Sequence, residues 1–314
     1  MELRPAAIGP PALMGPQKHR EGGFCTAMDK AIRYDKYHGL GNDYIVIDPG
    51  QCGGELSPEM IRLACHRNCG LGADGILLGP FADKQANARV RIFNPDGSEA
   101  EKSGNGLRIF ARFLWDRGFA DKNALSLATS GGTVHCRLDE STGLISIDMG
   151  TVSFQSGEIP VSGALREVLE ETITVGGETL EISAAGIGNP HCVVFRDALS
   201  FQETCRLGPL LESHALFPNR TNVQFVKPLD RENIQIEIWE RGAGYTLASG
   251  SSSAASAAVA HRLGFCGPDM TVHMPGGKLA IHVDADNRIT LKGPVVRVSE
   301  GHLHPELFRQ KLPD

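Results

Sequence analysis

Residues 103–114 read SGNGLRIFARFL, and 146 positions further along the chain residues 249–260 read SGSSSAASAAVA. Each stretch is a Ser-Gly pair followed by small or apolar residues at helical spacing, which predicts a helix that begins at the Ser-Gly pair. Gly118 and Gly264 follow the two runs and suit the C-terminal ends of such helices. The two stretches therefore indicate one structural unit that occurs twice in the chain.

Three further matches recur in the same order at nearly the same offset. They are Gly39–Asn42 with Gly186–Asn189 and Ala73–Leu78 with Arg220–Phe225 at an offset of 147, and Phe93–Gly97 with Ile238–Gly242 at 145. Each match is weak alone, but four in one order at offsets of 145–147 are strong. The chain is therefore predicted to be two copies of one fold that meet near residues 149–151.

Within each copy, strand-like runs come before the helix. The runs Tyr44–Ile47, Ala88–Phe93 and Gln235–Trp239 are apolar or alternate with period two. This order predicts a mixed α+β fold of two pseudo-symmetric domains, each a strand-rich shell around a central helix. Residues 31–149 form the first half and 150–294 the second. Residues 1–30 are rich in Pro and Gly and lack the apolar run of a secretory signal, so they are predicted to be a disordered extension.

Composition excludes several classes of function. The 314 residues include 31 Lys and Arg against 37 Asp and Glu, a net charge of −6 that disfavours binding to nucleic acid. No apolar run is long enough for a transmembrane helix. The eight cysteines are scattered along the chain, which favours reduced thiols in a cytoplasmic protein. Cys65, His66 and Cys69 lack a second pair with ligand spacing, so no metal site is predicted.

The two Ser-Gly starts suggest a ligand as well as a fold. The first N–H groups of a helix lack partners and carry partial positive charge, so each start could hold a carboxylate. Serine is also an ordinary N-cap, and that explanation suffices for one such start. Two equivalent starts in a duplicated chain favour a shared site between the domains, with one group on each side of a single carbon atom.

Six motifs together resemble the diaminopimelate epimerase family of cofactor-independent amino-acid epimerases, over essentially all of Tyr34 to Gly301. The motifs are His38–Asp43, Gly70–Gly75, Asn94–Glu99, Ser103–Gly106, Gly188–Cys192 and Glu240–Gly244. The resemblance implies epimerisation of diaminopimelate by removal of the Cα proton on one face and its replacement on the other. It also implies that residues 295–314 return to the first domain.

The resemblance assigns site residues by position. The residues that would bind the remote amino-acid end are Asn42, Asn94, Asn189, Asn222 and Arg241. Gly104, Asn105, Gly250 and Ser251 would offer N–H groups to the reacting carboxylate, while His191 and Glu240 would flank the proton-transfer pair, with Glu240 also contacting substrate. Taken singly, each has a plainer explanation: the asparagines could form turns, His191 could be structural, and Glu240 could pair with Arg241.

One departure from the family pattern concerns the reacting groups. The proton-transfer pair of the family is two cysteines, and the matching positions here are Ser103 and Ser249. A serine hydroxyl is a far weaker acid than a thiol and usually needs an adjacent base. Lys102 precedes Ser103 and is expected to point into water.

Three explanations for the serines compete. In the first, a natural branch uses the hydroxyls with His191 and Glu240 as bases. In the second, the protein binds an amino acid without turnover. In the third, the cysteines were replaced deliberately, which the further departures at Lys102 and Tyr245 disfavour. A related isomerase that uses only Glu240 or His191 is a further alternative.

The resemblance also bears on partners. It implies no cofactor and a small amino acid as the ligand. Because homodimers are common in the family, it suggests a homodimer as well.

Overall fold

The computed structural model describes residues 31–53, 55–120 and 124–312, so the predicted extension at 1–30 lies outside the described residues. The first half contains β1 (Ile32–Gly39), β2 (Asn42–Ile47), α1 (Pro49–Cys52), α2 (Pro58–Cys65), β3 (Ile76–Phe81), β4 (Ala88–Phe93), β5 (Glu99–Ala100), α3 (Gly104–Asp116), β6 (Leu125–Thr129), β7 (Gly132–Asp139) and β8 (Leu144–Thr151).

The second half repeats this order and adds a C-terminal segment. It contains β9 (Glu171–Val175), β10 (Glu178–Gly186), β11 (Pro190–Phe195), α4 (Phe201–Glu212), β12 (Asn222–Pro228), β13 (Asn233–Glu240), β14 (Gly244–Thr246), α5 (Gly250–Arg262), β15 (Asp269–Met274), β16 (Gly277–Val283), β17 (Arg288–Gly293), β18 (Val296–Leu303) and the 3₁₀ helix η2 (Pro305–Arg309).

The strand registers repeat between the two halves. In the parallel pair of β2 and β3, Ile45 lies opposite Ile76, and in β11 and β12 Cys192 lies opposite Val223, which is the same pairing displaced by 147 residues. Helices α3 and α5 begin and end 146 residues apart. The predicted α+β class of two pseudo-symmetric domains is therefore confirmed.

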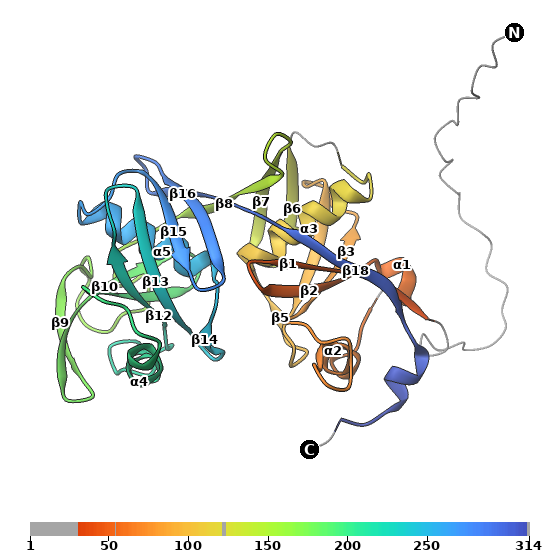
Figure 1. The fold of residues 1–314 in the computed structure, drawn as a ribbon, viewed down its shortest axis with the longest axis horizontal. Helices are drawn as coiled ribbons and strands as arrows, with labels where there is room; N and C mark the ends of the chain where they lie inside the picture. The colour runs from red at the N-terminus through yellow and green to blue at the C-terminus, as the bar shows by residue number, and fades with distance from the viewer. Residues whose placement is uncertain (1–30, 54, 121–123, 313–314) are drawn as a thin grey trace, which may run out of the picture.

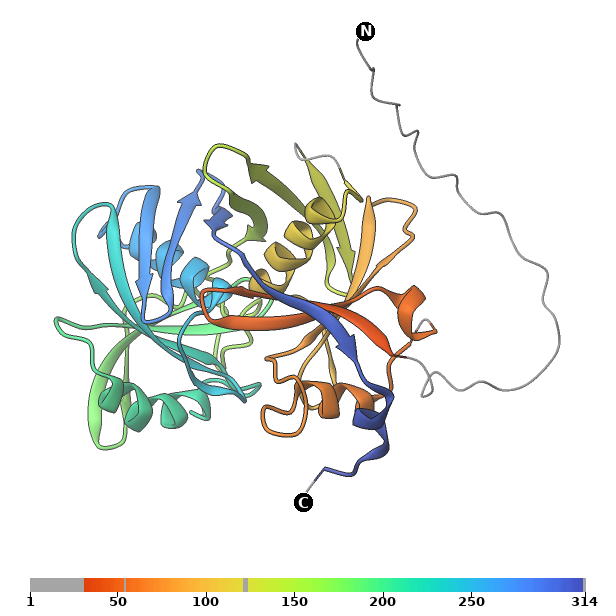
Figure 2. The same cartoon turned by 45° about the vertical axis from the view of Figure 1, so that its right-hand side comes forward.

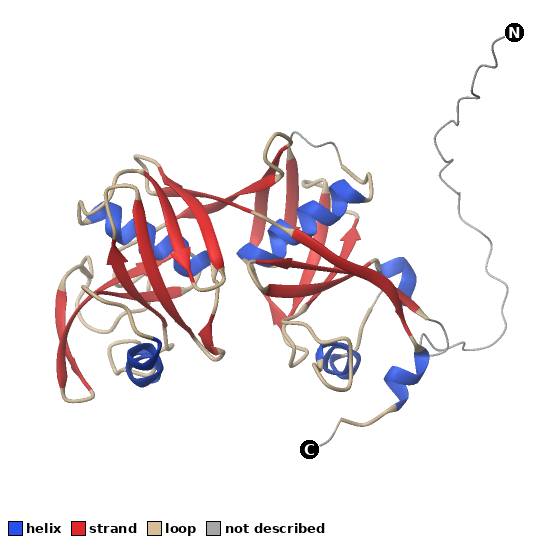
Figure 3. Ribbon diagram, viewed as in Figure 1, coloured by secondary structure: helices blue, strands red, loops and turns tan. Residues whose placement is uncertain are grey.

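Each domain wraps its strands around one central helix, α3 or α5, and carries a second helix, α2 or α4, on the outside (Figures 1 and 3). Helix α3 fills its domain with large side chains such as Phe110 and Leu114, whereas α5 is buried through small residues such as Ala255 and Ala257. The small side chains of α5 let the surrounding strands pack close to its backbone. Apolar residues around both central helices form one continuous core.

Two strands cross between the domains and join their sheets. β8 pairs with β7 of the first half and with β17 of the second, and β18 returns from the second half to pair with β1 (Figures 1 and 2). The predicted meeting point near residue 149 thus falls inside a strand that both sheets share. The crossing strands fix how the two central helices face each other.

Candidate active site

The N-terminal ends of α3 and α5 meet at the domain interface. A Cβ atom built on Gly104 would lie 3.6 Å from the Cα of Gly250, and one built on Gly250 would lie 3.5 Å from the Cα of Gly104. Met149 of β8 packs against the same point, because its Sδ would lie 3.4 Å from that Gly104 Cβ. Backbones can approach this closely because glycine lacks a side chain. Two positive helix ends therefore converge on one place.

Ser103 is the N-cap of α3 and is half-buried. Its backbone is extended, with φ of −141° and ψ of 118°, and its Oγ accepts a hydrogen bond from the Gly106 N–H at 3.1 Å. The same Oγ lies 3.1 Å from the phenol oxygen of Tyr44 on β2. Capping thus fixes the rotamer of the hydroxyl, and the phenol supplies its side-chain partner.

Ser249 caps α5 in the equivalent way and is buried. Its Oγ accepts from the Ser252 N–H at 3.4 Å and lies 3.5 Å from Ser251 Oγ. Glu240 ends β13 close by. Burial raises the pKa of the Glu240 carboxyl, the Asp74 charge adds to the rise, and hydrogen bonding from Ser249 opposes it. A carboxylate held in this way is a poised proton acceptor beside a hydroxyl.

His191 lies on β11 and is fully buried. Its Nε2 lies 2.9 Å from Asn189 Oδ1, and burial lowers its pKa to about 3, which an interaction with the Gln224 side chain opposes. Gln224 in turn donates to Ser252 Oγ at 3.0 Å. Among the hydrogen bonds of the described residues, none joins His191 to Ser103 or Ser249. Among the described residues His191 Nδ1 and Gln224 Oε1 have no hydrogen-bond partner, so no hydrogen bond joins the imidazole to the start of α5.

Asn42 and Asn105 form a polar chain on the first domain. Asn42 donates to Asp74 Oδ2 at 2.9 Å and accepts from Asn105 Nδ2 at 3.1 Å. Asn105 Oδ1 accepts from the buried Arg108 at 2.7 Å, and burial lowers the pKa of Arg108 to about 10. These amides therefore link the start of α3 to Asp74, which is also paired with Arg67 at 2.6 Å.

The second domain holds Asn222 and Arg241 together. Asn222 is buried, donates to the carbonyl of Pro190 at 2.9 Å and accepts from the backbone N–H of Arg241 at 3.0 Å. The Arg241 side chain is exposed, and its Nη1 donates to the Asn219 carbonyl at 3.2 Å. The structure thus joins these two predicted residues through the backbone and leaves the guanidinium at the surface.

Asn94 stands apart from the other predicted residues. It is exposed after β4 and donates to Ser98 Oγ at 3.0 Å within its own turn. No hydrogen bond of the described chain connects it to another residue assigned to the site.

Two further features of the region differ from the sequence-based expectation or were missed by it. Lys102 is not in water: its ammonium donates to the Met149 carbonyl at 3.0 Å and is half-buried, because the turn before α3 folds back onto β8. Tyr44 was missed. The signal that could have found it is the 147-residue offset, which pairs Tyr44 with His191.

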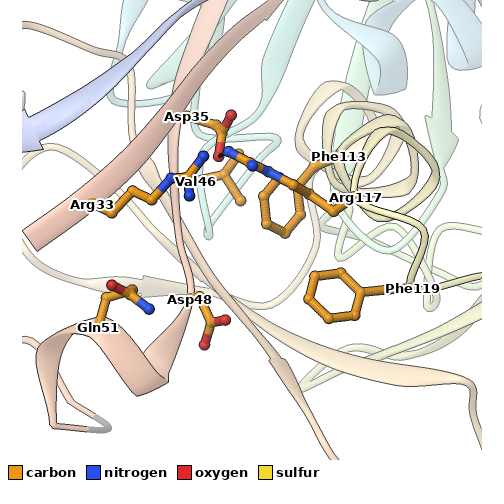
Figure 4. A pocket seen from close by; sticks show the side chains of 8 residues that line it. All are labelled: Arg33, Asp35, Val46, Asp48, Gln51, Phe113, Arg117 and Phe119. Carbon is orange, nitrogen blue, oxygen red and sulfur yellow. Dashed lines mark hydrogen bonds and ion pairs between the residues drawn. The ribbon is translucent and has the colours of Figure 1, made fainter. Parts of the chain in front are cut away.

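A shallow pocket of about 150 Å³ lies elsewhere, on the first domain (Figure 4). It is lined by Arg33, Asp35, Val46, Asp48, Gln51, Phe113, Arg117 and Phe119. None of the predicted site residues lines it, and its buried Asp35 is paired with Arg117 at 2.6 Å.

No cluster of three or more His, Cys, Asp or Glu side chains suited to a metal occurs in the part of the chain that the structure describes. Within that same part, no helix has the length and apolar character needed to cross a membrane.

Comparison with known proteins places these motifs in context. A family model for diaminopimelate epimerase matches residues 34–155 and 183–298. The chain is 52% identical over 277 residues to diaminopimelate epimerase 2 of Nostoc sp. (strain PCC 7120), covering 88% of this chain and 97% of that protein. It is 40% identical over 276 residues to diaminopimelate epimerase of Moorella thermoacetica, covering 86% and 98% respectively.

Solved structures with low sequence identity share the fold. A hydroxyproline epimerase from Agrobacterium vitis matches with a TM-score of 0.66 at 15% identity, covering 87% of this chain and 92% of that chain. A PhzF-family phenazine biosynthesis protein from Bacillus anthracis matches with a TM-score of 0.63 at 18% identity, covering 87% and 99%.

Proposed function

The chain belongs to the diaminopimelate epimerase family, and from that premise we propose that it interconverts LL- and meso-diaminopimelate by proton exchange at Cα without a cofactor. The meeting of two serine-capped helix starts is the observation that carries this proposal. The N–H groups of Gly104, Asn105, Gly250 and Ser251 are the donors proposed to hold the reacting carboxylate. As the Cα proton leaves, negative charge grows on that carboxylate, and two converging helix dipoles stabilise it.

In the proposed reaction the two serines act on opposite faces of Cα. One hydroxyl oxygen, freed of its proton by a base, accepts the Cα proton while the electron pair stays on the substrate as a carbanion delocalised into the carboxylate. The other hydroxyl donates its proton to the opposite face and completes a new C–H bond. We assign Glu240 as the base at Ser249, because burial raises the pKa of its carboxyl, which makes it a better proton acceptor than an ordinary Glu.

We assign the remote amino-acid end of the substrate to Asn42, Asn94, Asn189, Asn222 and Arg241 on the strength of the family motifs. The exposed guanidinium of Arg241 supplies a positive charge for a carboxylate of that end. We assign His191 to flanking the proton-transfer pair, also on the strength of the family motifs.

The test is incubation with LL-diaminopimelate in deuterated water, followed by nuclear magnetic resonance and chiral chromatography. The expected result is deuterium at Cα together with formation of the meso isomer. Ser103→Ala and Ser249→Ala are each expected to lower kcat by at least about 100-fold. Full activity in either alanine variant contradicts the two-serine mechanism.

The second candidate function is an amino-acid-binding protein without turnover, and binding without proton exchange separates it from an epimerase. If diaminopimelate binds saturably to the wild-type protein but no amino acid exchanges its Cα proton, the protein is a binding protein and the epimerase proposal is wrong. Arg241→Ala is expected to weaken binding by about 10-fold or more through loss of a charged contact.

We also propose that the protein acts in the cytoplasm, which the scattered cysteines favour, and that it forms a homodimer, as the family resemblance suggests. Light scattering of the purified protein tests the assembly, with an expected mass of twice that of one chain.

A further inference from the structure

The hydroxyl of Ser103 has a buried phenol as its neighbour. Tyr44 lies on β2 with 7% of its surface exposed, and its Oη is 3.1 Å from Ser103 Oγ. Burial raises the pKa of Tyr44 to about 12, and the charges of Glu240 and Asp74 add to the rise. The phenol is therefore protonated at neutral pH.

Hydrogen-bond accounting shows what this proton does. Ser103 Oγ has two lone pairs and one proton of its own. The Gly106 N–H fills one lone pair at 3.1 Å. If the phenol fills the other, the Ser103 proton points away from both donors, and a negative charge on Oγ would be held by two hydrogen bonds. Hydrogen bonds to the charged form favour that form.

The pseudo-symmetry shows that the two serines have different neighbours. The strand registers place Tyr44 on β2 where His191 stands on β11. They also place Asn94 after β4 where Glu240 ends β13, since Phe93 pairs with Glu99 as Trp239 pairs with Tyr245. The offset of 145 expected here from the sequence is therefore wrong by one residue, and the structural offset is 146. The first domain thus has a neutral amide where the second has a carboxylate. The Ser103 hydroxyl has a phenol oxygen 3.1 Å away, whereas the hydroxyl within reach of Ser249 is that of Ser251 at 3.5 Å.

Resting on the proposed function, we propose that Tyr44 is the positioning residue of Ser103 and that it makes the two serines unequal. The phenol donates to Ser103 Oγ and directs the Ser103 proton toward the substrate. When Ser103 gives up that proton to the carbanion, its oxygen becomes an alkoxide that Tyr44 and the Gly106 N–H stabilise. In this direction Ser249 accepts the Cα proton as its own proton passes to Glu240, and the carbanion takes its new proton from Ser103. After the product leaves, Glu240 loses its proton to water and Ser103 regains one from water, which restores the starting enzyme.

Tyr44→Phe tests the proposal because it removes the hydroxyl and keeps the ring. We expect kcat with diaminopimelate to fall about 100- to 1,000-fold, the range for loss of one donor at a developing oxyanion. The decisive readout is the primary isotope effect with substrate deuterated at Cα, measured from each stereoisomer. With one stereoisomer Ser103 removes the proton and the isotope effect should rise. With the other, Ser103 only donates, and the effect should fall toward 1.

Tyr37→Phe is the matched control. Tyr37 is a fully buried tyrosine on β1 of the same domain, and its hydroxyl donates to Asp116 at 3.0 Å. Its removal costs a comparable buried hydrogen bond, yet it should leave both isotope effects as in the wild type. A merely structural role for Tyr44 would make the two variants behave alike.

Repeating Tyr44→Phe in the Ser103→Cys background gives a second test. A thiolate forms with modest help, so the loss of the phenol should there lower kcat less than about 3-fold. The proposal is overturned if Tyr44→Phe keeps kcat within about twofold of the wild type, or lowers it without separating the two isotope effects. If the wild type itself shows no exchange, the proposed function has failed instead.

Discussion

At Ser103 and Ser249 the side-chain oxygen, in place of the sulfur of a cysteine, sets the acidity of the reacting group. The double variant Ser103→Cys, Ser249→Cys should raise kcat by about 10-fold or more, because a thiol ionises far more readily than an alcohol at the same helix start. Steady-state rates with LL-diaminopimelate measure the gain. Each single variant should gain less than the pair. If the pair gains nothing, neither position transfers a proton.

His191 makes the stability of the protein depend on pH. Its pKa is lowered to about 3 by burial, so the folded protein resists a proton that the unfolded chain accepts near 6.5. The contribution of neutral His191 to stability is therefore fully present above about pH 6.5 and is lost as the pH falls toward 3. As the pH falls from 7.5 to 4.5, the free energy of unfolding should decrease by about 3 kcal/mol less in His191→Gln than in the wild type.

Urea unfolding at the two pH values measures this loss in the wild type and the variant. His282→Gln is the control, because it makes the same substitution at a histidine that is exposed beside Asp269. Parallel pH slopes for the wild type and His191→Gln would rule out a buried, neutral imidazole.

The position of a single residue could be predicted where a local motif contains it. It could not be predicted where the residue depends on a contact with a distant part of the chain. The motifs placed Ser103 and Ser249 at helix starts, since Ser-Gly before a periodic run is a local signal. They did not give the partner of Ser103, because Tyr44 comes from a strand 59 residues away in the sequence. Lys102 was predicted wrongly for the same reason: the carbonyl it reaches belongs to β8, 47 residues on.

At the scale of elements, the two central helices fill equivalent spaces in opposite ways. Ile109 of α3 and Ala255 of α5 occupy corresponding positions, and both are fully buried. Ile109→Ala should lower the free energy of unfolding by about 2–5 kcal/mol through a cavity. Ala255→Ile should lower it by about 1–3 kcal/mol through overpacking. Urea denaturation measures both.

A stabilising effect of Ala255→Ile would mean that α5 is loosely packed. Ala111→Ser provides a reference on α3, since it changes volume little at another fully buried site.

The elements themselves were largely predictable from local patterns. The runs 44–47, 88–93 and 235–239 lie within β2, β4 and β13. Gly118 and Gly264 have positive φ just past the ends of α3 and α5, as their spacing indicated. The pairing of β1 with β18 carries no local signal, because it joins residues more than 250 positions apart.

At the scale of the whole molecule, the crossing strands make each domain depend on the other. A chain ending at Val295 lacks β18, so it loses the ladder to β1 and the ion pair between Arg297 and buried Asp35. Several hydrogen bonds at about 1 kcal/mol each predict a loss on the order of 5 kcal/mol in the free energy of unfolding. A chain ending at residue 310 keeps β18 and η2 and serves as the control.

The two tryptophans allow the domains to be followed separately, since Trp115 lies on α3 and Trp239 on β13. Fluorescence in a Trp239→Phe background reports the first domain alone. In the chain ending at Val295, both domains should unfold at lower urea because β8 couples their sheets. Unchanged unfolding of the second domain would show that this coupling is weak.

The pairing of β18 with β1 also determines when the first domain can finish folding during synthesis. β1 is the first described strand to leave the ribosome, and its partner β18 begins at residue 296 of 314. The nascent first domain therefore shows an open β edge during almost the whole of synthesis, a state prone to wrong pairing with other chains. Ribosomes stalled before residue 296 should carry an incomplete first domain, however long they wait.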